Sequence, residues 1–485
     1  MIRYNKLLFI IVIISLASFS ANAQQGNTMY YIDNVPQSNE LNPARQHRCK
    51  VHLGCPALSQ IYFTGENTGF TYNDIVQSVP GNNDEIVLFL NEQGIGKDEF
   101  LSDLPKVGYA SVEASSRMAS LGLRLDRYYF TFNINQKFFG RFSYPKEYFS
   151  LLLEGNVVDG QYQSYDLSNL AVDIKSYREY ALGVSEQIND QWNFGVRLKI
   201  LFGQFNFNLE NNSKLQTTQD QWILPKDALN LNTSIPGVEV TDSSGMLEEV
   251  KTTEAFEDDA GSFITDEFLS HKNLGVAIDF GAIYRMNDQF EFSLSILDIG
   301  SISWKNNVAN MSQKAEFNFE GYRIATLDQD SIVERDFVDE LVDSAGFEVT
   351  NESYTTGLPA KIYLGGRWFA NEVVSFGILS KTEIYHGRLR PQVTFSGNLN
   401  ENFISAALSY TIMNRNYNHI GFGINFKIAP FNLFIISDNI PLSWNRLYNS
   451  DLPLYPYDYK TFNIRFGLSL LFGCKDPRRD TPLIF

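Results

Sequence analysis

Most of this sequence lacks long apolar runs. After residue 23 no run reaches the roughly 18 apolar residues of a transmembrane helix, so we expect none there. Before that point, Arg3 and Lys6 precede an apolar run over 7–19, and Ala21-Asn22-Ala23 forms a small-residue cleavage site. This pattern predicts a secretory signal peptide over residues 1–23, because the run is too short to span a membrane. A signal anchor is the alternative interpretation.

Cysteine is scarce, with three residues in the chain. Cys49 and Cys55 lie close together near the predicted mature N-terminus, and Cys474 lies near the C-terminus. In an oxidising periplasm Cys49 and Cys55 can form a disulfide across a small loop, or they can stay reduced. The sequence leaves both possibilities open.

Catalytic and metal-binding motifs are also missing. The five histidines sit in no nucleophile motif such as G-x-S-x-G, and only His47 and His52 have a ligand-like spacing, outside any known metal motif. The acidic run Glu257-Asp258-Asp259 lacks the spacing of a calcium loop and is more typical of a solvated loop. We therefore expect no enzymatic activity, no metal and no cofactor.

Phe, Tyr and Gly are abundant, at 38, 25 and 33 residues, which favours an all-β protein. The clearest pattern lies in 274–299, which reads LGVAIDFGAIYRMNDQFEFSLSILDI. Every second residue from Leu274 to Tyr284 is apolar, the residues between are mostly small or polar, and the alternation restarts after Asn287-Asp288. This period of two predicts a hairpin with one apolar face, whose strands are long enough to cross a bilayer.

The same pattern recurs along the chain. Similar strands are predicted at 128–134, 192–202, 404–412, 420–428 and 462–472, and a short helix at 145–154. The turns at 189–190, 287–288, 371–372, 400–401 and 429–430 are short, whereas the intervening connections are long. This asymmetry is typical of outer-membrane barrels, so residues 107–473 predict a transmembrane antiparallel β-barrel of about 14 strands, within a range of about 12 to 16. A soluble sandwich or propeller is the alternative, but its strands average about five or six residues.

Charge is unevenly distributed. The formal net charge of −17 is carried by two acidic insertions, 210–272 and 306–357, and the rest of the chain is nearly neutral. We expect both insertions to be solvated loops on the outer side of the membrane, which disfavours nucleic acid as a partner.

Charged residues also lie on the polar face of the predicted strands. A charge that faced lipid near the bilayer midplane would cost about 2–4 kcal/mol, so we expect these side chains to face the lumen. They are Arg197, Lys199, Asp279, Arg285, Glu291, Arg367, Lys427 and Arg465.

The segment 24–106 lacks sustained alternation and contains Asn42-Pro43-Ala44. On this motif the chain resembles the FadL-like superfamily of outer-membrane barrels, transporters with fourteen strands and an N-terminal hatch that carries Asn-Pro-Ala. Other stretches (Tyr-Pro-Lys-Glu, Leu-Asp-Ile-Gly and Leu-Pro-Ala-Lys) resemble an uncharacterised Bacteroidota barrel family similar to PorV of the type IX secretion system. The resemblance implies that residues 24–106 form a hatch with early strands, and that Asn42, Pro43 and Ala44 belong to this hatch. Residues 474–485 are then a C-terminal tail.

Two functions follow for a monomeric barrel embedded in the lipid of a Gram-negative outer membrane. The first is passive uptake of a hydrophobic small molecule through the hatch-plugged lumen, which predicts a continuous apolar pocket beneath the acidic insertions. The alternative is a partner-binding role, in which the insertions dock a secreted or secretion-system protein. It predicts a plugged, polar lumen and exposed apolar residues at loop tips, such as Trp222, Ile223 and Leu224.

Overall fold

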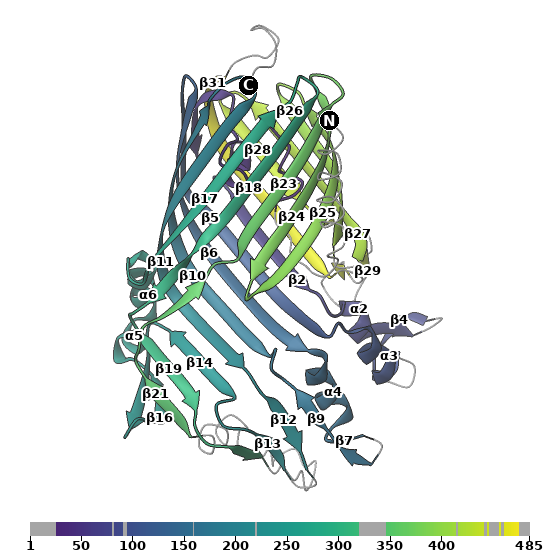
Figure 1. The fold of residues 1–485 in the computed structure, drawn as a ribbon, viewed down its shortest axis with the longest axis vertical. Coiled ribbons are helices and arrows are strands. Elements are labelled where there is room, and N and C mark those ends of the chain that lie inside the picture. The colour runs from purple at the N-terminus through teal and green to yellow at the C-terminus, as the bar shows by residue number, and fades with distance from the viewer. Residues whose placement is uncertain are drawn as a thin grey trace, which may run out of the picture.

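The computed structural model describes residues 26–79, 82–90, 95–158, 160–218, 221–319, 346–413, 416–440, 444–445, 455–456 and 460–474. Fourteen antiparallel strand positions close into a barrel, as the alternation predicts (Figure 1). The predicted signal peptide, residues 1–23, lies outside the described residues, as do 320–345 of the second insertion and 475–485 of the predicted tail.

Thirteen of the barrel positions are each held by one strand. These are β5 (Val107–Leu125), β6 (Tyr128–Pro145), β10 (Ala171–Gln187), β11 (Trp192–Asn211), β17 (Leu274–Arg285), β18 (Phe290–Trp304), β23 (Ala360–Phe369), β24 (Val374–Tyr385), β25 (Arg388–Asn400), β26 (Ile404–Met413), β27 (Asn416–Ile428), β28 (Phe431–Ser437) and β31 (Thr461–Cys474). The remaining position is shared by β1 (Cys49–Gly54) and β2 (Ile61–Asn67), which both pair with β5 on one side and β31 on the other. These two strands close the barrel.

The two ends of the barrel differ, as predicted. The five predicted turns all lie at one end, together with the turn at 126–127 between β5 and β6 and the end of β31 (Figure 1). We call this the short-turn end. The long connections lie at the opposite end, which we call the loop end. The helix predicted at 145–154 is α4 (Lys146–Glu154) and lies at the loop end.

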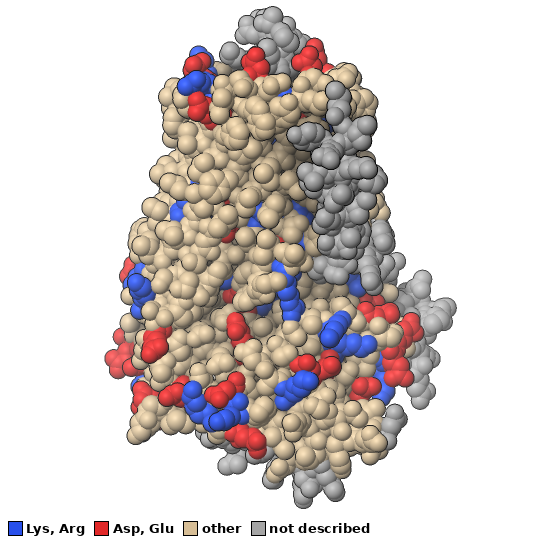
Figure 2. Space-filling view, viewed as in Figure 1, with Lys and Arg blue, Asp and Glu red and all other residues tan. Residues whose placement is uncertain are grey.

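Alternating strands produce an apolar outer face. Leu274 and Val276 of β17 are 57% and 62% exposed, while Asp279 on the opposite face of the strand is fully buried. Figure 2 shows few charged side chains on the viewed face between the short-turn rim and the loop end. No helix among the described residues is long and apolar enough to cross a membrane.

Where the structure describes them, the acidic insertions form helices and strands and are not plain solvated loops, which corrects the sequence prediction. They and their neighbours contain β7 (Val157–Val158), β8 (Gln161–Tyr162), β9 (Ser164–Asp166), β12 (Lys214–Thr217), β13 (Trp222–Leu224), β14 (Leu229–Ser234), β15 (Val238–Ser243), β16 (Met246–Thr252), α5 (Glu254–Asp258), α6 (Ala260–Leu269), β19 (Val308–Gln313), β20 (Phe317–Phe319), β21 (Phe347–Thr350) and β22 (Tyr354–Gly357). Strands β20, β13, β12 and β9 form one sheet and so join three separate connections.

An apolar core holds these connections together. Leu151, Tyr165, Leu215, Phe317 and Phe347 are among the buried residues of this core. We call the folded unit formed by α4, β9, β12–β14 and β19–β21 the cap. Trp222, Ile223 and Leu224 form β13. Leu224 is buried in this core, Trp222 packs against it and Ile223 is half-buried, so the expectation that they are exposed at loop tips is wrong.

A second, smaller group lies in the connection from β2 to β5. It contains α2 (Tyr72–Ile75), β3 (Val76–Val79), β4 (Asn82–Leu88) and α3 (Gly96–Asp103), and the short strands β29 (Trp444–Asn445) and β30 (Tyr455–Pro456) lie in another connection. Phe100, Leu101 and Leu104 are buried there, and Phe149 of α4 packs against them.

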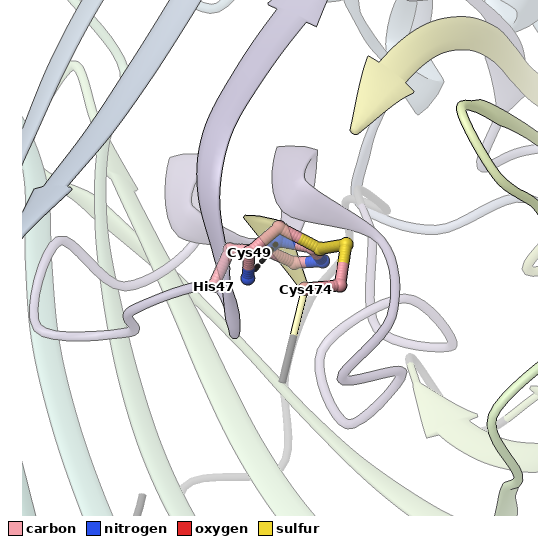
Figure 3. The surroundings of a disulfide bond; sticks show 3 residues. All are labelled: His47, Cys49 and Cys474. Carbon is pink, nitrogen blue, oxygen red and sulfur yellow. Dashed lines mark hydrogen bonds between the residues drawn. A yellow bond between two sulfur atoms is a disulfide. The ribbon is translucent and has the colours of Figure 1, made fainter. Parts of the chain in front are cut away.

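The disulfide differs from the predicted pair. Cys49 bonds to Cys474, its register partner on β31 (Figure 3). Cys55 is a free thiol. Cys49 begins β1 and Cys55 directly follows its end. About 20 Å of extended strand therefore separates them, far more than the roughly 7 Å that a disulfide spans between Cα atoms. Cys474 therefore belongs to the barrel wall, and the covalent bond joins the closing strand to the last strand.

Candidate functional site

Residues 26–48 fill the short-turn half of the lumen, and we call them the plug. Met29, Tyr30 and Ile32 have no exposed surface, and the short helix η1 (Pro36–Glu40) follows them. The plug has its own apolar contacts with the barrel wall. The wall residues of this cluster are Leu297, Tyr363, Leu379, Ala407, Phe434 and Ile436.

Glycines on the inner face of the wall make room for the plug. A Cβ atom at Gly195 would lie 2.3 Å from the carbonyl group of Pro43, and one at Gly281 would lie 2.2 Å from Oδ1 of Asn42. Gly377 faces the ring of Tyr31 in the same way. Three strands thus forgo a side chain where the plug backbone or a large ring comes closest.

Asn42-Pro43-Ala44, the predicted hatch motif, lies in the plug against the β17–β18 hairpin. Nδ2 of Asn42 donates to the hydroxyl of Tyr30 at 3.1 Å and to the carbonyl of Leu294 at 3.3 Å. Oδ1 of Asn42 accepts from the amide of Ala44 at 3.0 Å, which shapes the turn. In this motif Asn42 closes a tight turn with Ala44 and lies against Gly281 of the wall.

Asp33 makes the first ionic contact between plug and wall. Both of its carboxylate oxygens accept hydrogen bonds from Arg367 of β23 at 2.9 Å, and Arg45 of the plug approaches to 3.0 Å. Burial raises the pKa of Asp33, but Arg367 and Arg45 outweigh burial and hold the pKa below its ordinary value. The carboxyl group is ionised, so this contact is a bidentate ion pair.

Glu40 makes the second ionic contact. It pairs with Arg465 of β31 at 2.9 Å and with Arg117 of β5, and Gln60 donates to it at 2.9 Å. Burial raises the pKa of Glu40, but the two arginines outweigh it and lower the pKa to about 2. Glu40 thus holds the plug to strands on both sides of the closing strand.

A cluster of charges on the wall lies beside the plug. Asp279 accepts from Arg197 at 3.1 Å and lies 2.8 Å from Lys199. Lys199 also contacts Asp298 at 2.6 Å, and Arg197 donates to the carbonyl of Asn39 in the plug at 2.7 Å. These charges are buried and paired with one another, because a buried charge without a partner is costly.

The remaining predicted lumen residues lie near the short-turn end. Arg285 pairs with Glu291 at 3.4 Å, and Glu291 also lies 3.8 Å from Arg45 of the plug. Lys427 is half-buried near the end of β27. Burial lowers the pKa of His47 in the plug, and the charge of Lys427 lowers it further. All eight predicted charges thus lie on the lumenal side or at its rim.

Sequence reasoning missed the acidic partners in the plug and several wall charges. Asp33 and Glu40 are the only carboxylates in residues 26–48. Once this segment is taken as a plug, they are the natural partners for the lumenal arginines. Lys137 and Glu179, which pair at 2.7 Å, and Asp298 occupy further inward-facing positions that were not among the eight predicted charges.

Two polar cavities lie between the plug and the loop end. The inner chamber, of about 90 Å3, is lined by the plug residues Glu40 and Leu41 and by charged wall residues that include Lys137, Glu179 and Lys199. The outer cavity, of about 250 Å3, lies beneath the cap. Its lining residues are Arg141, Ser143, Ser168, Asn169, Ala171, Asp173, Asn208, Glu210, Asn211, Asn212, Tyr385, His386, Arg388 and Arg390.

The cavities adjoin at a layer of charged and hydroxyl side chains. Lys175 of the inner chamber donates to the hydroxyl of Tyr385 in the outer cavity at 2.8 Å. Arg141 and Arg390 share Glu383 at 3.1 and 2.9 Å in the same layer. Within the described residues, no three His, Cys, Asp or Glu side chains gather in a group that could hold a metal ion.

Comparison with known proteins gives one family match in sequence. The model described as "Family of unknown function (DUF5723)" matches residues 43–438. No curated protein matches the chain.

Solved structures similar to this chain include two toluene transporters and a FadL homologue. The Pseudomonas aeruginosa FadL homologue is 12% identical over 93% of this chain and 96% of its own, with a TM-score of 0.39. The Ralstonia pickettii toluene transporter TbuX is 7% identical over 91% and 94%, with a TM-score of 0.39. The Pseudomonas putida toluene transporter TodX is 9% identical over 93% and 94%, with a TM-score of 0.34.

Proposed function

The chain belongs to the family of unknown function DUF5723, and we propose that it is an outer-membrane channel, closed at rest by its plug, that passes a polar solute. Each part of this proposal rests on a separate feature of the barrel: the outer face, the lumen and the plug.

The outer face supports the membrane location. Soluble proteins rarely expose contiguous apolar patches of more than a few hundred Å2, yet large apolar side chains are exposed on successive strands around this barrel. Closure of the barrel pairs every strand edge, which the hydrocarbon core of a bilayer requires. In bacterial barrels the short turns face the periplasm, so the cap faces outward.

The observation that carries the channel proposal is the pair of adjoining polar cavities above a plug held by ion pairs. A continuous apolar pocket would support uptake of the hydrophobic ligand expected from the sequence. The cavity beneath the cap is instead lined by Asn, Ser, Arg and acidic side chains. This lining favours a solute that forms hydrogen bonds.

Conductance in planar bilayers tests the proposal. We expect the wild-type protein to conduct rarely, and Arg367→Gln to increase the open fraction because Asp33 loses its bidentate partner. Lys272→Gln is the matched control, since Lys272 pairs with Glu267 outside the lumen, near the end of α6. Absence of conductance in all three proteins, each shown to be folded, would contradict the channel.

Partner binding is the second candidate, and the cap favours it. Its apolar core joins three connections into a folded unit on the outer side of the barrel, which gives a partner a rigid surface. Purification from outer membranes in mild detergent tests this secretion-accessory role. A protein that co-purifies stoichiometrically and is lost when cap surface residues are changed supports it, and recovery of lipid alone contradicts it.

A further inference from the structure

We propose that the route past the plug runs along β6 and β10 and ends at a gate formed by Gln46 and Arg124. This inference rests on the proposed channel function and assigns it a pathway. The inference follows from which strands of the wall bond to the plug and which do not.

The plug is bound to most of the wall. Its hydrogen bonds and ion pairs end on β5, β11, β17, β18, β23, β24, β25, β26 and β31. None of these contacts reaches β6 or β10, which are adjacent strands. Strands β27 and β28 also lack these bonds, but Phe434 and Ile436 of β28 pack in the apolar cluster of the plug. The pair β6 and β10 contributes no residue to these bonds or to that cluster, so we take it as the least tethered part of the wall.

On the β6–β10 side the inner face of the wall carries mostly small and polar side chains, with the buried ring of Tyr129 opposite Ser185. In the short-turn half of β10, Ala181, Gly183 and Ser185 lie at alternate positions, and β6 contributes Thr131 and Asn133 beside them. Ser185 is 2% exposed, and its hydroxyl has no hydrogen-bond partner among the described residues. A buried hydroxyl without a protein partner is a site for internal water.

The inner chamber already extends into this side. It is lined by Glu40 and Leu41 of the plug and, facing them, by Asn133 of β6 and Ala181 of β10. Ser185 is four residues further along β10 toward the short-turn end, or about 13 Å of strand. The chamber and Ser185 thus mark successive points on one path beside the plug.

Gln46 lies across the end of this path. Its Oε1 accepts from Arg124 of β5 at 2.6 Å, and its Nε2 donates to the carbonyl of Arg127 in the β5–β6 turn at 3.0 Å. Both contacts are at least partly exposed, so water competes for them. A single side chain that bridges a turn with two such bonds can leave without unpacking the core of the plug.

Cysteine accessibility tests the route without requiring transport. Ala181→Cys and Ser185→Cys, each in a Cys55→Ser background, are compared in liposomes with Ala407→Cys, which lies in the apolar contact between plug and β26. With a small charged methanethiosulfonate reagent we expect Ser185→Cys to react roughly tenfold faster than Ala407→Cys. Adding Gln46→Ala should accelerate the reaction at Ser185→Cys further and leave Ala407→Cys unchanged.

The outcomes separate the route from the channel. Equal, slow reaction at the two sites overturns the route. Conductance that persists after Ser185→Cys is fully modified by a bulky reagent also overturns the route but leaves the channel standing. Fast reaction at Ser185→Cys in a barrel that never conducts supports the hydrated path and contradicts the channel function.

Discussion

Asp33 and Arg367 are 334 residues apart in sequence, yet two hydrogen bonds of 2.9 Å join the carboxylate of one to the guanidinium of the other. One residue belongs to the plug and the other to the wall, so this ion pair helps to keep the lumen closed. A planar fork that meets a carboxylate fixes orientation as well as distance. The plug is therefore held in a defined position in the lumen.

Breaking this pair should destabilise the barrel. Removal of one partner of a buried ion pair typically costs about 3–5 kcal/mol, because the other charge stays buried, although Arg45 remains close to Asp33 here. We expect Arg367→Leu to lower the urea midpoint of unfolding in micelles, and Asp33→Asn combined with Arg367→Leu to recover part of the loss. A double variant no better than Arg367→Leu alone would show that the pair is not coupled.

The wall glycines should tolerate no side chain where they meet the plug. Gly195→Ala places a methyl group against the Pro43 backbone, at 2.3 Å in the present geometry, so we expect the plug to be displaced and bilayer conductance to rise. Gly65→Ala on β2 is the matched control, because its added Cβ meets nothing within 4 Å. Similar conductance of the two variants would refute the close packing of Gly195 against the plug.

The contact made by Glu40 should depend on pH in a known direction. A carboxyl whose folded pKa is lowered contributes stability above its unfolded pKa, and this stability is lost as the pH falls through the folded value. The pKa of Glu40 falls from an ordinary 4.5 to about 2. The stability difference between wild type and Glu40→Gln, measured by urea unfolding, should be constant above about pH 5 and should shrink from there to about pH 2. A difference that instead grows as the pH falls would contradict this assignment.

The disulfide should stabilise the closed barrel. Loss of a disulfide typically costs on the order of 2–4 kcal/mol, so Cys474→Ser should lower the temperature at which the folded band disappears on a semi-native gel. Cys55→Ser removes a free thiol and should leave that temperature unchanged. If the two variants behave alike, the Cys49–Cys474 bond contributes nothing to closure.

The apolar outer face should reject charge. Leu182 of β10 is 61% exposed, and an arginine that faces lipid near the midplane costs about 2–4 kcal/mol. We expect Leu182→Arg to reduce the folded fraction in liposomes, whereas Asp190→Arg in the short β10–β11 turn should not. Equal folding of both variants would place this face outside the hydrocarbon.

The barrel itself was predictable because its signal is local. Leu274–Tyr284 alternates within one strand, and the Asn287-Asp288 turn sits between two strands that pair with each other. The two-residue period and the short turns therefore suffice to predict the strands, the hairpin and the orientation of the barrel in the membrane. The inward position of Asp279 and Arg197 follows from the same period, because a charge on the other face would meet lipid.

The plug contacts and the cap were not predictable because they depend on distant segments. Nothing near Asp33 in the sequence points to Arg367, and β13 pairs with β20, nearly a hundred residues away. Trp222 and Ile223 look like exposed apolar residues until the strands that cover them are known. Cys49 and Cys55 likewise look like a pair in sequence, although strand geometry holds them apart.

The position of the closing strand sets an order of assembly. Strands β5 to β31 follow one another in the chain, and each neighbouring pair forms through a connection of its own. The closing strand instead comes from the opposite end of the chain, with Cys49 and Cys474 separated by 425 residues. Because the plug directly precedes this strand in the chain, the placement of the plug is linked to the pairing of the closing strand. We therefore expect entry of the plug and sealing of the wall to be coupled late steps of folding, and the open sheet must be kept from aggregating until then.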